Sequence, residues 1–283
     1  MVESATFDPR MIIRDVIATL VRKPKLFVPL LLPLLVSVIS EVGWRVIFHF
    51  YGYEDEIFGL EDGIVYLIIG WSALTALIGV LIGLIASAWA IKTYHIYHLH
   101  RRVELLKGLK YGMRFLWRMA LVRLVVFLML LIPITIPVNV MNLMIIGTMG
   151  TKNYSIWYYL FPRVPMQLIT MMVMVFFAYI YQAVIIGRAG VFGSIKWSFI
   201  AARKNYIQTF VIMLLPILFT LPFLVLDLLL WTTGVRSSIL RSFLNGWIPG
   251  ILGFAASAVV IYSLTKGFLV STTKKKEKES LWD

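Results

Sequence analysis

Acidic and amide side chains inside long apolar stretches are the first candidates for chemistry in this sequence. Glu41 and Asp227 lie in the outer halves of two such stretches, and Asn139 and Asn142 lie near the corresponding level of a third. Ionisable groups inside a membrane are costly and by default mark ion or proton sites. If these stretches line one centre, Glu41, Asn142 and Asp227 would form an outward-opening polar cluster that binds a cation or a proton.

A simpler interpretation needs no site at this level. Arg45 follows Glu41 by four residues, the spacing at which opposite charges pair on a helix. Asp227 would then reach the interface or pair with Arg236 or Arg241. The residues favour this pairing, and the cluster, with Arg45 as a member, stays a hypothesis.

A run of histidines is the second candidate. His95 and His98 share one face of a helix, whereas His100 and Glu104 share another, so a straight helix cannot bring all four to one metal ion. Tyrosine and histidine beside an arginine pair are ordinary at a headgroup boundary. We therefore expect no metal centre, no cofactor and no catalytic residue.

Basic residues recur on three segments, each of which leads into an apolar stretch. The first begins with Asp8 as N-cap and Pro9 as the first helical residue, and it ends at Pro24. Its apolar face would hold Ile13, Val16, Ile17 and Leu20.

The second and third basic segments repeat this pattern. Arg101–Arg118 places basic residues on one stripe and an apolar side on Leu105, Leu106, Leu109, Met113 and Leu116. Gly193–Lys204 sets Ile195, Phe199 and Ala202 against its basic residues. Such helices lie at the headgroup level of a membrane, with apolar side chains among the acyl chains. The predicted headgroup-binding residues are Arg22, Lys23, Lys107, Lys110, Arg114, Arg118, Lys196, Arg203 and Lys204.

The composition indicates which solvent surrounds these segments. Of the 283 residues, 60% are hydrophobic and only 14% are charged, against about 25% charged in soluble domains. This excludes a soluble enzyme, a disordered chain and a coiled-coil rod. The net charge of +13 is the kind that membrane proteins use for orientation and headgroup contact, so no nucleic-acid partner is expected. Cysteine is absent, which excludes disulfides and thiol chemistry.

The apolar stretches predict an all-α, polytopic membrane protein. A bilayer requires about 20 apolar residues per helix, and six stretches qualify: Leu26–Phe50, Ile64–Ala90, Met119–Ile146, Met166–Ile186, Tyr206–Trp231 and Trp247–Val270. With these spans, 22 of the 27 basic residues fall on one side. The positive-inside rule therefore predicts a multi-pass protein of the cell membrane with both termini in the cytoplasm.

Weak internal similarity predicts a threefold pseudo-repeat. Lys110-Tyr111-Gly112 overlays Lys196-Trp197-Ser198 at a shift of 86 residues, and Arg22-Lys23 overlays Arg203-Lys204 at a shift of 181. We expect one membrane domain over 1–271, with repeats 8–100, 101–190 and 191–271, and a basic, disordered cytoplasmic tail over 272–283. The alternative is that any multi-span protein acquires basic cytoplasmic loops.

One stretch has the pattern of a known membrane family. Gly187 to Ser198, running through Arg203-Lys204-Asn205 into an apolar span, resembles the six-helix membrane domain ahead of some bacterial glycerophosphoryl diester phosphodiesterases. It also resembles related prokaryotic membrane families of unknown function. The resemblance implies a fold and a membrane location, and it carries no catalytic residue.

The sequence leaves three classes of function open. The leading hypothesis is a non-enzymatic, lipid-contacting scaffold or accessory membrane subunit, whose partners are anionic headgroups and a membrane protein or a second copy. The alternative is a transporter of a small solute or lipid that uses the level of Glu41 and Asp227. A lipid-headgroup enzyme comes third, because the basic segments offer cations for phosphate but no clear acid, base or nucleophile.

Overall fold

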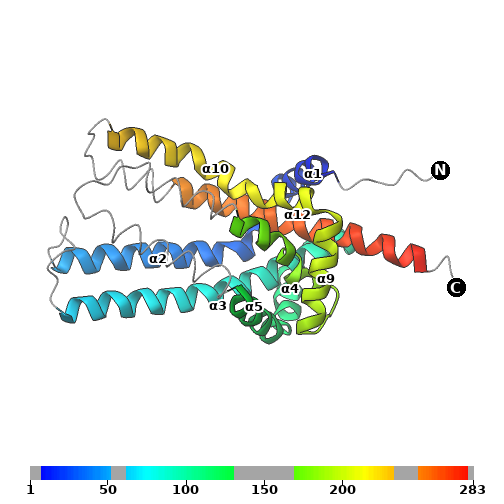
Figure 1. Ribbon diagram of the computed structural model, residues 1–283, viewed down its shortest axis with the longest axis horizontal. Coiled ribbons are helices and arrows are strands. Elements are labelled where there is room, and N and C mark those ends of the chain that lie inside the picture. Colours follow the sequence, from blue (N-terminus) through cyan, green and yellow to red (C-terminus); the bar gives the residue numbers. More distant parts are fainter. Residues whose placement is uncertain (1–7, 52–61, 131–168, 233–247, 280–283) are drawn as a thin grey trace. The chain divides into compact units, whose positions relative to one another are not determined.

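The computed structural model describes residues 8–51, 62–130, 169–232 and 248–279. Every regular element in these ranges is a helix, and they contain no strand (Figure 1). The predicted all-α class is confirmed. The helices are α1 (Pro9–Arg22), η1 (Pro24–Phe27), α2 (Val28–Tyr51), α3 (Asp62–His100), α4 (Leu105–Met113), α5 (Leu116–Leu130), η3 (Val175–Phe177), α8 (Ile180–Ile185), α9 (Val191–Lys204), α10 (Tyr206–Thr232) and α12 (Ile248–Glu279).

Within these ranges, two helices are long and apolar enough to cross a membrane: Gly70–His100 in α3 and Leu252–Ser271 in α12. A third candidate is bent, because α1 and the helix over Pro24–Ser40 meet at 104°. The bend follows from the sequence: Lys23 has a non-helical backbone and Pro24 has no N–H to continue a helix. Ile169–Ile185 and Tyr206–Phe219 are shorter apolar helices.

The chain forms two compact units, each built from segments that are far apart in the sequence. Unit 1 comprises Met1–Ile17, Phe115–Leu215 and Tyr262–Asp283, and unit 2 comprises Ala18–Arg114 and Pro216–Ile261. In unit 2, α2 and α3 lie side by side, and α4 packs on the last turns of α3 (Figure 1). A Cβ on Gly43 of α2 would collide with the indole of Trp71 on α3, so glycine permits their close contact.

Unit 1 has its core where α9 packs on a broken helix. The helix that includes residues 169–174 changes to the 3-10 turn η3, and α8 resumes it at Ile180. Tyr179 lies at the break, fully buried, with its ring 6.3 Å from the ring of Phe268 on α12. Met119 and Val122 of α5 and Tyr262 of α12 are fully buried in the same unit.

The start of the first basic segment is confirmed in detail. The Asp8 side chain accepts a hydrogen bond of 2.9 Å from the Arg10 N–H, and α1 begins at Pro9. An N-cap aspartate satisfies an amide that has no partner inside the helix, and proline is well suited to the first helical position. α1 ends at Arg22, just before Pro24, as predicted.

Three other predicted boundaries are wrong. Arg101–Arg118 is not one helix: α3 continues to His100, Arg101 takes a left-handed φ of 55°, and a short break separates α4 from α5. α9 begins at Val191, before the predicted Gly193. The basic tail was expected to be disordered, yet α12 continues without interruption to Glu279.

Candidate functional site

α4 packs on α3 through its two glycines. A Cβ on Gly108 would collide with the side chain of Thr93, and a Cβ on Gly112 would lie 2.9 Å from the carbonyl of Ala88. The indole N–H of Trp89 donates a hydrogen bond of 2.8 Å to the carbonyl of Leu105 at the start of α4. The side of α4 that packs on α3 is therefore formed by its two glycines.

As a result, α4 exposes two large apolar side chains of its predicted apolar side. Leu106 is 81% exposed and Met113 is 44% exposed, as a side chain that reaches acyl chains must be. Lys107, Lys110 and Arg114 are exposed on the same helix. α4 thus presents cations and apolar side chains together.

The charges of α4 are arranged in two local contacts. The Lys107 ammonium lies 2.7 Å from a carboxylate oxygen of Glu104, and this contact lowers the pKa of the Glu104 carboxyl. The Arg114 guanidinium lies 5.1 Å from the centre of the Tyr111 ring. Exposed pairs of this kind contribute little to stability.

α9 packs through serines where α4 packs through glycines. The Ser198 hydroxyl accepts a hydrogen bond of 3.0 Å from the Tyr179 N–H and donates one of 2.8 Å to the Phe176 carbonyl, so it bridges the break in the neighbouring helix. Ser194 is fully buried one turn earlier.

The exposed side of α9 again mixes apolar and basic residues. Phe192 is 78% exposed and Phe199, on the predicted apolar side, is 47% exposed. Lys196, Arg203 and Lys204 are exposed, whereas Ala202 of the predicted apolar side is buried within the protein.

α1 has a larger buried face. Ile12 is buried, as are Val16 and Leu20, two of the four residues of the predicted apolar face. The other two, Ile17 at 43% exposed and the half-buried Ile13, are partly open to the surroundings. The exposed residues of α1 include Arg10, Met11, Arg14, Val21 and Arg22.

An ion pair ties α1 to α12 within unit 1. The Lys266 ammonium donates a hydrogen bond of 2.8 Å to a carboxylate oxygen of Asp15. This hydrogen bond, and then the charge of Lys266, lowers the pKa of Asp15 below its usual value of 3.8.

The pair predicts a loss of stability in acid. The carboxyl of the unfolded chain lacks this partner and binds a proton at higher pH than the folded one, so the contribution is complete above about pH 3.8 and is lost as the pH falls through the folded-state pKa. Because Asp15 is half exposed, we expect only about 0.2–1 kcal/mol. The unfolding temperature of the wild type should fall more steeply below pH 4 than that of Asp15→Asn. Equal profiles for the two proteins would contradict this role.

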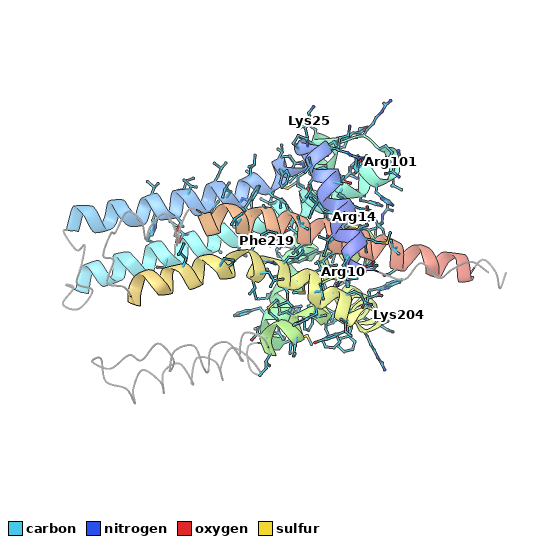
Figure 2. The ribbon with its side chains drawn as sticks, turned by 90° about the horizontal axis from the view of Figure 1, so that it is seen from above. Arg10, Arg14, Lys25, Arg101, Lys204 and Phe219 are labelled. Atoms are coloured by element: carbon cyan, nitrogen blue, oxygen red, sulfur yellow. The ribbon has the colours of Figure 1, made fainter. Side chains whose placement is uncertain are left out.

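The basic residues of unit 2 meet at one end of its helices. η1, which contains Lys25, packs against α3, and Arg101 follows the last residue of α3. Figure 2 shows Lys25 and Arg101 at the same end of unit 2, away from Phe219. Lys23 and Arg102 are exposed beside them in the sequence.

The predicted polar cluster is placed only by its backbone. Glu41 and Arg45 lie on α2 and Asp227 lies on α10, but their side chains fall outside the described part of the structure. Asn139 and Asn142 lie wholly outside the described residues.

The histidine run lies at the end of α3, where the Lys92 ammonium is 3.4 Å from His95 Nδ1. Among the described residues, no three His, Asp or Glu side chains lie close enough together to hold a metal ion.

The sequence did not point to Gly108, Gly112, Ser194 and Ser198 as packing residues. The available signal was that small residues stand four positions apart on one face of each helix.

Comparison with known proteins adds nothing to this geometry, because no protein-family model, curated protein or solved structure matches the chain.

Proposed function

We propose that this chain is a non-enzymatic, multi-pass protein of the cell membrane, which works as a lipid-contacting scaffold or accessory subunit. Its working surfaces are α1, α4 and α9. The supporting observation is that each of these helices packs inward on small or aliphatic residues and exposes basic and large apolar side chains together. A membrane surface accommodates both kinds of side chain, since anionic headgroups attract cations and acyl chains accept apolar groups.

The proposal includes six spans with both termini in the cytoplasm. The lengths of α3 and α12 and the apolar character of α2 and α10 support this arrangement. The 104° turn at Pro24 is the geometry expected where a helix lying along a membrane surface leads into one that crosses it. The basic end of unit 2 supports a cytoplasmic position for that end.

The boundaries of the surface helices support the threefold pseudo-repeat. α1, α4 and α9 begin at Pro9, Leu105 and Val191, which are 96 and 86 residues apart. The second interval equals the shift at which the two sequences overlay. The first and third helices align at a shift of 182, one residue more than the overlay of Arg22-Lys23 on Arg203-Lys204.

Binding of anionic lipid tests the proposed function. We expect the full chain in phosphatidylcholine vesicles to unfold at a higher temperature when phosphatidylglycerol is included, because a ligand that binds only the folded state stabilises it. Neutralising Lys107, Lys110, Arg114 and Arg118 together should reduce this increase, and salt should weaken it. The double variant Glu41→Gln, Asp227→Asn is the control and should keep it.

Two outcomes would contradict the scaffold proposal. The first is no effect of phosphatidylglycerol on the unfolding temperature of the wild type. The second is loss of the effect in the Glu41 and Asp227 variant with retention in the basic variant, which would favour the transporter hypothesis instead.

A further inference from the structure

The three surface helices match residue by residue when they are aligned at their first residues. In this register, the fourth and eighth residues are buried in each helix, although their types differ: Ile12 and Val16 in α1, Gly108 and Gly112 in α4, Ser194 and Ser198 in α9. The same two positions therefore pack against neighbouring helices in all three cases, with aliphatic residues in α1, glycines in α4 and serines in α9.

Two exposed positions recur in the same register. The sixth residue is an exposed cation in each helix: Arg14, Lys110 and Lys196. The ninth is a large apolar residue with nearly constant exposure: Ile17 at 43%, Met113 at 44% and Phe199 at 47%. A cation and an apolar side chain therefore recur together three times, in helices that share little sequence.

Helix geometry places this pair on the outer side. Residues three apart are neighbours on one helix face. In a helix with 3.6 residues per turn, the midpoint of the sixth and ninth positions lies about 150° around the axis from the midpoint of the fourth and eighth positions. The pair therefore points away from the buried face of its helix.

We propose that each pair binds one anionic phospholipid, with the cation on the phosphate and the apolar side chain between acyl chains. This inference rests on the proposed function and adds the binding residues and their number. A headgroup phosphate joined to hydrocarbon is the ligand that has both halves of the pair at adjacent positions.

The local charges favour Lys110 over its neighbour Lys107 as the residue that binds the phosphate. Lys107 is already 2.7 Å from the Glu104 carboxylate, which competes with a lipid phosphate for its charge. Beside Arg14, the carboxylate of Asp15 is compensated by Lys266. No other acidic residue lies on α1, α4 or α9.

Native mass spectrometry of the full chain, equilibrated with phosphatidylglycerol in excess phosphatidylcholine, tests the three sites. We expect three phosphatidylglycerol molecules to be retained per chain. Arg14→Gln, Lys110→Gln and Lys196→Gln should each remove one, and the triple variant should remove all three. Arg10→Gln, the same change one turn from Arg14 at an exposed position of α1, should keep all three.

Further variants separate binding from folding. Lys110→Arg and Lys196→Arg keep the charge and should retain three lipids. Met113→Ser keeps the cation and should reduce retention at the α4 site while the unfolding temperature in phosphatidylcholine stays unchanged. Phe199 does not serve for this comparison, because its ring also stacks on Phe176, with the ring centres 4.6 Å apart.

The possible results distinguish this inference from the function on which it rests. If the wild type retains phosphatidylglycerol but Arg10→Gln loses as much as Arg14→Gln, the three-site inference is overturned and general headgroup contact stands. If the wild type shows no preference for phosphatidylglycerol over phosphatidylcholine, both fail.

Discussion

Replacing Gly112 with alanine should destabilise the protein and detach α4 from α3. The new Cβ would lie 2.9 Å from the carbonyl carbon and oxygen of Ala88 and 3.2 Å from the amide nitrogen of Trp89. These backbone atoms lie inside a long helix and cannot rotate aside, so α4 itself must move. Overpacking of this kind costs about 1–3 kcal/mol, which exceeds the gain of about 1 kcal/mol in helix propensity. A lower unfolding temperature and faster hydrogen exchange over 105–113 would be the measured result.

Gly83→Ala in α3 is the matched control. No atom lies within 4 Å of a Cβ built on Gly83, so this change brings the same gain in helix propensity without a collision. It should leave stability unchanged or raise it by up to about 1 kcal/mol. If the two variants unfold at the same temperature, close packing at Gly112 is not what holds α4.

Replacing Ser198 with alanine should lower the free energy of unfolding by roughly 2 kcal/mol or more. The change removes the acceptor for the Tyr179 N–H and the donor to the Phe176 carbonyl. Each buried group left without a partner costs about 1–3 kcal/mol. Denaturation in mild detergent measures the loss, and hydrogen exchange at Tyr179 should report local opening of the helix break.

Ser194→Ala provides the comparison for Ser198. Ser194 is equally buried, but its hydroxyl donates only to the Val191 carbonyl within the first turn of α9, at 2.7 Å. Its loss should cost about 1 kcal/mol, the value of an ordinary hydrogen bond. Equal losses for the two serines would mean that bridging the break contributes nothing special.

Local signals in the sequence were sufficient to predict α1. Asp8, Pro9 and Pro24 act through the backbone of their own residues and neighbours, so their effect can be read without knowing what lies opposite. The apolar stretches likewise predicted long helices, although α3 and α12 continue well beyond the expected ends.

Apolar periodicity could not predict which side of each surface helix packs against the rest of the protein. In water, a large apolar side chain points inward because exposure is costly. In the membrane position proposed above, exposure of Leu106 or Phe192 carries no such cost, since acyl chains are as apolar as a protein core. The periodicity of leucines therefore no longer identifies the buried face of a helix. The value of Gly112 depends on the backbone of Ala88, which is 24 residues away and unknown from local sequence.

The residues of the proposed lipid sites could be predicted from the sequence only in part. The exposed cations lie on the predicted helices, because charge avoids buried faces in water and lipid alike. The apolar half of each proposed site, at Ile17, Met113 and Phe199, lies on a predicted apolar face, but the sequence alone did not show which apolar residues of that face are exposed.

The packing of α4 on α3, and of α9 on α8 and η3, has a consequence for biosynthesis. Both α4 and α9 contact the helix that directly precedes them in the chain, through Gly112 with Ala88 and Ser198 with Tyr179. Contacts between nearby residues form early, since little chain must be ordered to close them. Each pair can therefore assemble as soon as its second helix has been synthesised, before the rest of the chain is complete.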